Sequence, residues 1–168
     1  KIEIKMSDHL IDCEYKIITI DSASSTYIDN TKQNFYINLD EPLRNVYKIN
    51  IILAMINISQ TSPLNVSLEP IYINLNDYQR LIAKYNNNNI YYFESIIMEN
   101  SITSGTISIK NDFNSNDTIY YLNPIEPQLK RFQISLYDKE NNLIPKENIN
   151  KFVMKLGIYY NNRKTTRI

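Results

Sequence analysis

The stretch DHLIDC near the amino-terminus is the one cluster whose side chains are typical of a metal or nucleophile site. It holds Asp8, His9, Asp12 and Cys13, and His9 and Cys13 are the only histidine and cysteine of the chain. A structural zinc takes four ligands, mostly Cys and His, and a Cys–His nucleophile needs an oxyanion-stabilising loop. Neither requirement is met. We therefore predict no metal site and interpret the cluster as part of a polar terminal arm.

Carboxylates could in principle catalyse glycoside hydrolysis, which requires two of them at a set separation. Glu94, Glu99 and Asp112 are the candidates in this chain. Eighteen acidic residues bring such pairs together by chance in any β-sandwich, so we interpret these three as solvated loop charges. The sequence predicts no catalytic residue, no cofactor and no enzymatic activity.

Fourteen tyrosines are the remaining unusual feature, and six of them occur as adjacent pairs. The pairs are Tyr91–Tyr92, Tyr120–Tyr121 and Tyr159–Tyr160. Within a strand one ring of each pair must point inward and the other outward. Outward rings suit protein interfaces and sugar stacking. Codon bias in an A/T-rich genome, combined with β-propensity, explains their abundance equally well.

The overall composition indicates one neutral globular domain. A length of 168 residues suggests a single domain at 1–168, with an amino-terminal arm at 1–14 and a tail at 161–168. Eighteen basic and eighteen acidic side chains cancel, so no nucleic-acid partner is expected. A single cysteine forms no internal disulfide, and the longest apolar run, 51–56, is too short to span a membrane. No signal peptide is expected either.

Alternating apolar and polar side chains predict about nine short strands. They cover residues 15–20, 34–39, 47–59, 71–75, 90–98, 105–109, 118–122, 132–137 and 152–160. Pro42 is expected to end the second strand. The third is apolar on both faces from Ile51 onward, so it is expected to lie centrally in a sheet. Regularly spaced strands with little helix indicate an all-β sandwich or barrel.

One short helix is predicted in the loop that follows the strand at 71–75. Asn76 is a suitable N-cap, and Gln79 three residues later completes a capping box. Apolar side chains then recur at helical spacing. They are Tyr78, Leu81, Ile82 and Tyr85.

The strands at 132–137 and 152–160 carry the clearest alternation. Their expected core-facing side chains are Phe132, Ile134, Leu136, Phe152, Met154, Leu156 and Ile158. We expect these two strands to pair antiparallel, with their apolar faces over a shared core. The turn between them contains Asn141 and Asn142, and Asn tolerates a positive φ.

This carboxy-terminal stretch resembles the single jelly-roll minor capsid and penton proteins of large icosahedral (nucleocytoplasmic) DNA viruses. Pro124 and Pro127 match the proline-containing segment that precedes an amphipathic strand in that family, and the turn and last strand follow in the same order. The PIYINL stretch at 70–75 is similar to another strand of the family. The chain departs from the family at Asn141 and Asn142, where Gly is usual.

The resemblance implies an eight-stranded jelly roll with a structural role. It implies a minor capsid or vertex (penton) subunit that assembles with the major capsid protein, with other capsid proteins and with itself. A vertex position would make it a pentamer, within virions assembled in the host-cell cytoplasm. The candidate contact residues lie in the two terminal segments. They are Ile2, Ile4, Lys5, Arg163, Lys164 and Arg167.

Two other classes of function stay open on the sequence. A carbohydrate-binding, lectin-like β-sandwich would use exposed tyrosines as its sugar platform. A β-sandwich enzyme is the other alternative, although no residue is assigned a catalytic role in it.

Overall fold

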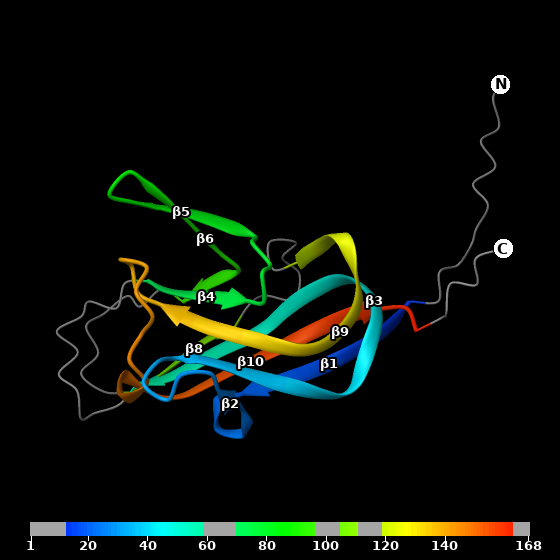
Figure 1. The fold of residues 1–168 in the computed structure, drawn as a ribbon, viewed down its shortest axis with the longest axis horizontal. Helices are drawn as coiled ribbons and strands as arrows, with labels where there is room; N and C mark the ends of the chain where they lie inside the picture. Colours follow the sequence, from blue (N-terminus) through cyan, green and yellow to red (C-terminus); the bar gives the residue numbers. More distant parts are fainter. Residues whose placement is uncertain (1–12, 59–69, 97–104, 111–118, 163–168) are drawn as a thin grey trace.

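The computed structural model describes residues 13–58, 70–96, 105–110 and 119–162, and these residues form antiparallel β-structure almost throughout (Figure 1). The predicted all-β class is therefore confirmed. The strands are β1 Glu14–Asp21, β2 Thr26–Tyr27, β3 Asn34–Ile58, β4 Ile71–Leu75, β5 Leu81–Tyr85, β6 Asn88–Tyr92, β7 Glu94–Ile96, β8 Gly105–Lys110, β9 Ile119–Tyr137 and β10 Ile149–Tyr160. Two single-turn 3₁₀ helices, η1 Ser22–Ser24 and η3 Lys146–Asn148, complete the described elements.

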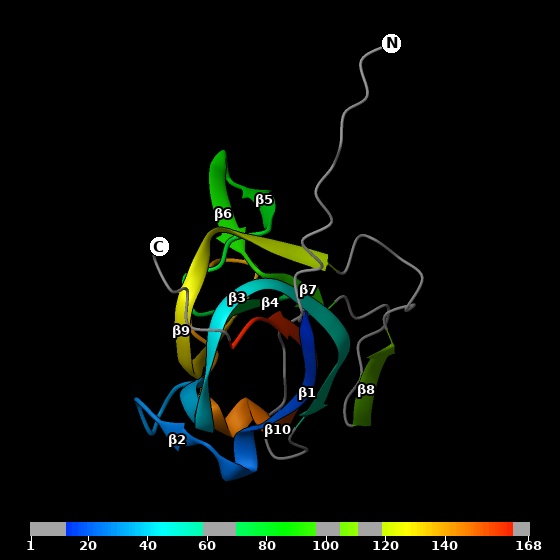
Figure 2. The ribbon, with the colours of Figure 1, turned by 90° about the vertical axis from the view of Figure 1, so that its right-hand side faces the viewer.

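Strand β3 is the centre of the main sheet, whose order is β1-β10-β3-β9-β4-β7. Its first half pairs with β9 and β2, and its second half pairs with β10, β8 and the start of β9. The register against β9 shifts between Asn38 and Leu43 and again between Val46 and Lys48, where β3 bends. Strands that bend in this way pass from one layer of a sandwich to the other. Figure 2 shows β3 arching around the core, so that the sheet curls on itself.

The strand boundaries differ from the prediction at Pro42. The segments at 34–39 and 47–59 were expected to be separate strands, but they form the two halves of β3. Pro42 lies in the interval where β3 has no residue paired with β9, so its missing N–H breaks no ladder hydrogen bond. The expectation that Pro42 ends a strand is wrong for this reason. In the same way, the segments at 118–122 and 132–137 are joined in β9, which contains a cis Asn123–Pro124 bond.

The core lies between the two layers of the curled sheet. Phe35, Phe93, Phe132 and Phe152 are its largest fully buried side chains. All seven core-facing side chains predicted on β9 and β10 are completely buried. Alternation of apolar and polar residues indicates only which side of a strand is buried, and this part of the prediction is confirmed.

The expected pairing of β9 with β10 is wrong. Strand β3 lies between them, with Phe132 of β9 opposite Ile37 and Leu156 of β10 opposite Ile51. The two strands share the core without sharing hydrogen bonds. The connection from Asp138 to Asn148 is long enough to cross between the layers, and Asn141 adopts the predicted positive φ, at 65°.

The predicted helix at 76–85 is also wrong, because this segment contains the first strand of the β5–β6 hairpin. Asn86 and Asn87 form its two-residue turn, with φ of 48° and 66°. Asparagine in both central positions favours this turn. Leu81 and Ala83 pack against a small cluster of Tyr72, Ile90 and Tyr92. Figure 1 shows the hairpin projecting from the body of the protein.

Asn76 has a different role from the expected helix cap. It adopts φ of 48° at the end of β4, and its Oδ1 accepts a hydrogen bond from the Gln133 backbone N–H at 2.7 Å. The side chain therefore ties the β4–β5 connection to β9.

Gln33 is the only buried side chain in the described residues that joins several segments by its amide. Its Nε2 donates to the carbonyl oxygens of Ile149, at 2.9 Å, and Lys146, at 3.2 Å. Its backbone N–H donates to the Ile144 carbonyl, and its own carbonyl accepts from Leu136. One residue thus fastens the start of β3 to the end of β9 and to the start of β10.

Gln33→Leu should lower the free energy of unfolding by about 1–3 kcal/mol, because two carbonyl groups lose their donor in a buried site. Urea denaturation followed by circular dichroism measures the change. Gln79→Leu, at an exposed position, is the matched control and should leave stability within about 0.5 kcal/mol. Equal effects of the two substitutions would contradict the assigned role of Gln33.

Candidate functional site

The curled sheet leaves two strand edges unpaired within the described residues. Strand β1 pairs with β10 on one side, and no described strand pairs with its other side. In β3, Ile37, Asn38 and Leu43 pair with β9 on one side only, and no described strand pairs with residues 39–42. A groove of about 320 Å³ lies between these edges, lined by residues 16–19 of β1 and by residues 37–41 and 43 of β3. We call it the edge groove.

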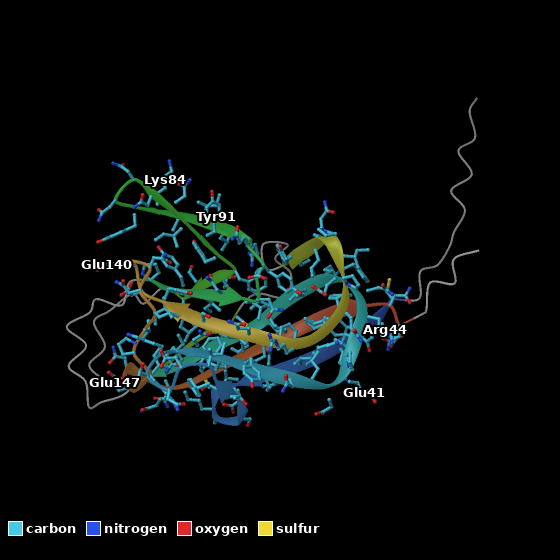
Figure 3. All side chains as sticks on the ribbon, viewed as in Figure 1. Glu41, Arg44, Lys84, Tyr91, Glu140 and Glu147 are labelled. Atoms are coloured by element: carbon cyan, nitrogen blue, oxygen red, sulfur yellow. The ribbon has the colours of Figure 1, made fainter. Side chains whose placement is uncertain are left out.

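The two ends of the edge groove are fixed by hydrogen bonds. At one end, Asn161 donates its N–H to the Arg44 carbonyl at 3.1 Å and accepts from the Asn45 amide at 2.9 Å. At the other end, Tyr27 of β2 pairs with Phe35. Figure 3 shows Glu41 and Arg44 on the β3 bend, at the margin of the molecule. The groove is therefore held open by the fold on both sides.

The walls of the edge groove are apolar with charges at the rim. Ile18, Ile37 and Leu39 are half-buried there, and Ile17 is 56% exposed. Lys16 stands on the β1 side, while Asp40 and Glu41 stand on the β3 side. An edge strand with exposed backbone groups and an exposed isoleucine is a template for another strand.

An aromatic cluster lies at the β1 end of this region. Tyr159 is at its centre, with the Tyr15 ring at 4.7 Å and the Tyr47 ring at 6.3 Å between centroids. The Lys48 ammonium lies 3.6 Å from the centroid of the Tyr159 ring, a cation–π contact. Burial, together with the neighbouring Cys13 thiol, raises the pKa of Tyr47 to about 12.

Gly157 makes room for this aromatic cluster. The chain has only two glycines, and a Cβ at position 157 would lie 2.6 Å from the Tyr15 hydroxyl oxygen and 2.7 Å from a ring carbon. The Tyr15 ring therefore covers the strand where a side chain would otherwise stand.

The predicted inward and outward arrangement of the paired tyrosines is observed in all three pairs. The rings nearer the core are Tyr92, Tyr120 and Tyr160. Their partners include Tyr91, 46% exposed, and Tyr121, 65% exposed. Figure 3 shows Tyr91 on the projecting hairpin. Tyr121 lies beside Lys48, which also contacts Tyr159, so it borders the aromatic cluster, whereas Tyr91 lies apart on β6.

A polar cleft of about 660 Å³ lies between the β4–β5 connection and β9. Asn76, Asp77 and Tyr78 line it from the connection, and β9 contributes residues that include Glu126 and Arg131. Asn38 of β3 lines both this cleft and the edge groove. The two features are therefore neighbours on either side of the first half of β3.

The Tyr78 hydroxyl is the most unusual group of the polar cleft. Its oxygen is covered and has no hydrogen-bond partner among the described residues, although Asn76 and Glu126 lie beside it. Its ring packs against Tyr120, with 5.7 Å between centroids. Burial raises the pKa of Tyr78 to about 12, and the Glu126 carboxylate adds to the increase, while Asn76 opposes it.

Most of the residues considered from the sequence for metal binding or catalysis lie outside the described part of the chain. Asp8, His9 and Asp12 are outside the described residues, and Cys13 is exposed. Within the described ranges no three His, Cys, Asp or Glu side chains gather as metal ligands. The predicted contact residues at 2–5 and 163–167 also lie outside the described part of the chain.

Glu94 is the one member of the proposed carboxylate set that the structure describes, since Glu99 and Asp112 lie outside it. Its Oε2 forms a 2.9 Å ion pair with Arg80, and both side chains are largely buried. The pair joins the start of the β5–β6 hairpin to β7. Glu94 is therefore a structural anchor on β7, and its interpretation as a solvated loop charge is wrong.

Neither the edge groove nor the polar cleft was predicted from the sequence. The β1 stretch did carry a signal, because Tyr15 and Ile17 are apolar on the face opposite Ile18 and Ile20. A strand apolar on both faces was expected at 47–59 only. The cleft has no comparable signal, because its residues come together from distant segments.

Comparison of the sequence with protein-family models finds no match, and comparison with curated proteins finds none either. Among the described residues, no helix has the length and apolar character required to cross a membrane.

Gly157→Ala should displace the Tyr15 ring from Tyr159 and lower the unfolding free energy by less than about 1 kcal/mol, because the added methyl meets the far end of a flexible side chain that is 48% exposed. Denaturant unfolding measures the loss. In the Gly157→Ala/Tyr15→Ala double variant the added methyl no longer meets a ring. The loss of unfolding free energy in the double variant should therefore be smaller than the sum of the losses in the two single variants. Strictly additive losses would contradict the proposed contact.

Tyr78→Phe should leave stability at pH 7 unchanged or slightly higher, because the hydroxyl that it removes has no partner. In the unfolded chain Tyr78 ionises near pH 10, whereas in the folded protein it keeps its proton to about pH 12. The folded state consequently loses stability as pH rises through this interval. The Tyr78→Phe variant should lose less stability over this interval, as measured by denaturation at pH 9 to 12.

Tyr121→Phe, at a ring that is 65% exposed, is the control for the loss of one tyrosine. A Tyr78→Phe variant that is destabilised at pH 7, or that follows the wild-type curve above pH 10, would contradict this description of the cleft.

Proposed function

We propose that this protein is a structural subunit of a viral capsid, a minor capsid or vertex protein that acts by assembly. Its partners are the major capsid protein, other capsid proteins and copies of itself, and its location is the virion, assembled in the host-cell cytoplasm. The observation that carries the proposal is the edge groove, in which two strand edges stand unpaired over apolar walls.

An extended segment of a neighbouring subunit is the occupant that suits the edge groove. Backbone N–H and C=O groups along β1 offer a ladder to such a strand, and alternate side chains of the strand would meet Ile18 and Ile37. Soluble proteins usually protect an edge strand with charges, prolines or bulges. Here β1 is a regular eight-residue strand with Ile17 exposed at its middle.

Other exposed apolar side chains support an assembly role. Large exposed side chains occur on several elements, among them Ile82 and Tyr91, which face each other across the projecting hairpin. Tyrosine is enriched at protein interfaces because its ring supplies contact area and its hydroxyl a hydrogen bond. Several separate contact surfaces are what a building block needs, since each subunit touches more than one neighbour.

The resemblance to single jelly-roll capsid proteins supports the same conclusion. The matched segments correspond to β4, β9, the turn that contains Asn141, and β10. A two-layered antiparallel sandwich is the architecture to which the jelly roll belongs. A jelly-roll topology for this chain is part of the proposal.

Ile17→Lys should weaken assembly by about tenfold or more without unfolding the subunit, because the change places an ammonium where a partner strand would cover it. Sedimentation velocity of the purified protein measures self-association. Recovery of tagged protein with virus particles measures incorporation.

Ile125→Lys is the matched control, because Ile125 is similarly exposed, at 50%, but lies on β9 outside the edge groove. It should assemble through β1 as the wild type does. The proposal is wrong if the wild-type protein is absent from particles and stays monomeric, or if Ile17→Lys assembles as well as the wild type.

A further inference from the structure

We infer that the polar cleft beside Tyr78 is a binding site for a neutral polyhydroxylated ligand of the saccharide class. This site goes beyond assembly, and it lies at a different place from the edge groove. It is also different from the exposed-tyrosine platform expected from the sequence, because none of the exposed tyrosines lines it.

The size of the polar cleft suits a small ligand. Binding pockets for small molecules measure roughly 300–1,000 Å³, and the cleft encloses about 660 Å³. One wall is strand β9, which pairs with β3 and β4. The other is the β4–β5 connection, which Asn76 fastens to β9 through its 2.7 Å bond to the Gln133 N–H. The cleft is therefore preformed by elements that are hydrogen-bonded to each other.

The charges of the cleft balance. Asp77 and Glu126 provide two carboxylates, and Lys130 and Arg131 provide two cations. A phosphate site would carry an excess of cations, and a metal site an excess of carboxylates. A cleft whose charges balance, with amide side chains among the charged groups, favours a ligand without net charge.

The hydrogen-bonding groups of the cleft are mixed, which matches hydroxyl groups. The Asn76 Oδ1 is already occupied by Gln133, so the group that Asn76 offers is its amide N–H₂, a donor. Glu126 accepts from the Gln128 N–H through one oxygen, so its second oxygen offers an acceptor. Sugar hydroxyls both donate and accept and therefore satisfy the two kinds of group together.

Tyr78 gives the cleft an incomplete hydrogen-bond network. A covered hydroxyl without a partner costs free energy, and buried polar groups usually have one. Glu126 stands beside this hydroxyl, so a ligand that reorients the Glu126 carboxylate would complete the network. Tyr78 then acts as a positioning residue for Glu126, while Glu126 and Asn76 contact the ligand.

Arg131 is held in place at the same site. Its guanidinium lies over the Tyr36 ring, 5.5 Å from the centroid. Stacking of this kind fixes the plane of the guanidinium and leaves its edge N–H groups for a ligand. An oriented donor loses less entropy on binding than a mobile surface arginine.

The experiment is a titration of the full ¹⁵N-labelled protein with galactose, mannose and N-acetylglucosamine, with inorganic phosphate and Ca²⁺ as separate arms. At least one sugar should shift the amide signals of Asn76, Tyr78 and Gln133, with a dissociation constant on the order of 1 mM for a ligand of this size. Phosphate and Ca²⁺ should leave these signals in place.

Glu126→Gln should weaken sugar binding by about tenfold, since it replaces a charged acceptor. Glu140→Gln, in the β9–β10 turn outside the cleft, is the matched control and should bind as the wild type (Figure 3). Tyr78→Phe should bind more weakly while staying as stable as the wild type at pH 7.

Different results would contradict the saccharide site in the polar cleft and the assembly role of the edge groove. Ile17→Lys disrupts the edge groove and leaves the cleft intact, so it should keep full sugar binding. The inference is overturned if no sugar shifts these amides at up to about 50 mM, roughly fifty times the expected constant. It is also overturned if phosphate or Ca²⁺ shifts them instead, or if Glu126→Gln binds as the wild type does.

Discussion

The path of β3 through both layers is the constraint on which the rest of the structure depends. Its 25 residues pair with β10, β9, β8 and β2, and two further strands, β1 and β4, pair with its neighbours β10 and β9. The bend at Asn45, where φ is 49°, turns the strand around the core. The two layers are continuous in the chain for this reason, and their side chains meet over a single core.

The same bend creates the edge groove. It brings the first half of β3 toward β1, but Asn161 and β2 hold only the two ends of the gap. Backbone groups inside the protein are satisfied by the ladders and by Gln33, as burial requires. The edges of β1 and β3 have no such partner strand among the described residues, and this difference is the physical basis for proposing assembly.

The edge groove and the polar cleft share Asn38, which stands between them on β3. The cleft lies on the β9 side of this segment and the groove on the β1 side. A partner strand in the groove and a saccharide in the cleft would therefore occupy neighbouring surfaces without overlapping. Such an arrangement is compatible with a capsid subunit that is anchored on one side and carries a ligand on the other.

The sequence by itself determined the all-β class, the inward faces of β9 and β10, the inward and outward rings of the paired tyrosines, and the positive φ of Asn141. These are local properties, because side-chain period and backbone preference act over a few residues. The neighbours of each strand were decided only in the tertiary structure. Residues 76–85 fit a helical period, yet the Asn86–Asn87 turn and pairing with β6 made them part of a hairpin. Strand β3 separates β9 from β10, and the cleft gathers Asn76, Glu126 and Arg131 from distant segments. Hydrogen bonds between strands join residues far apart in the chain, so no local pattern specifies them.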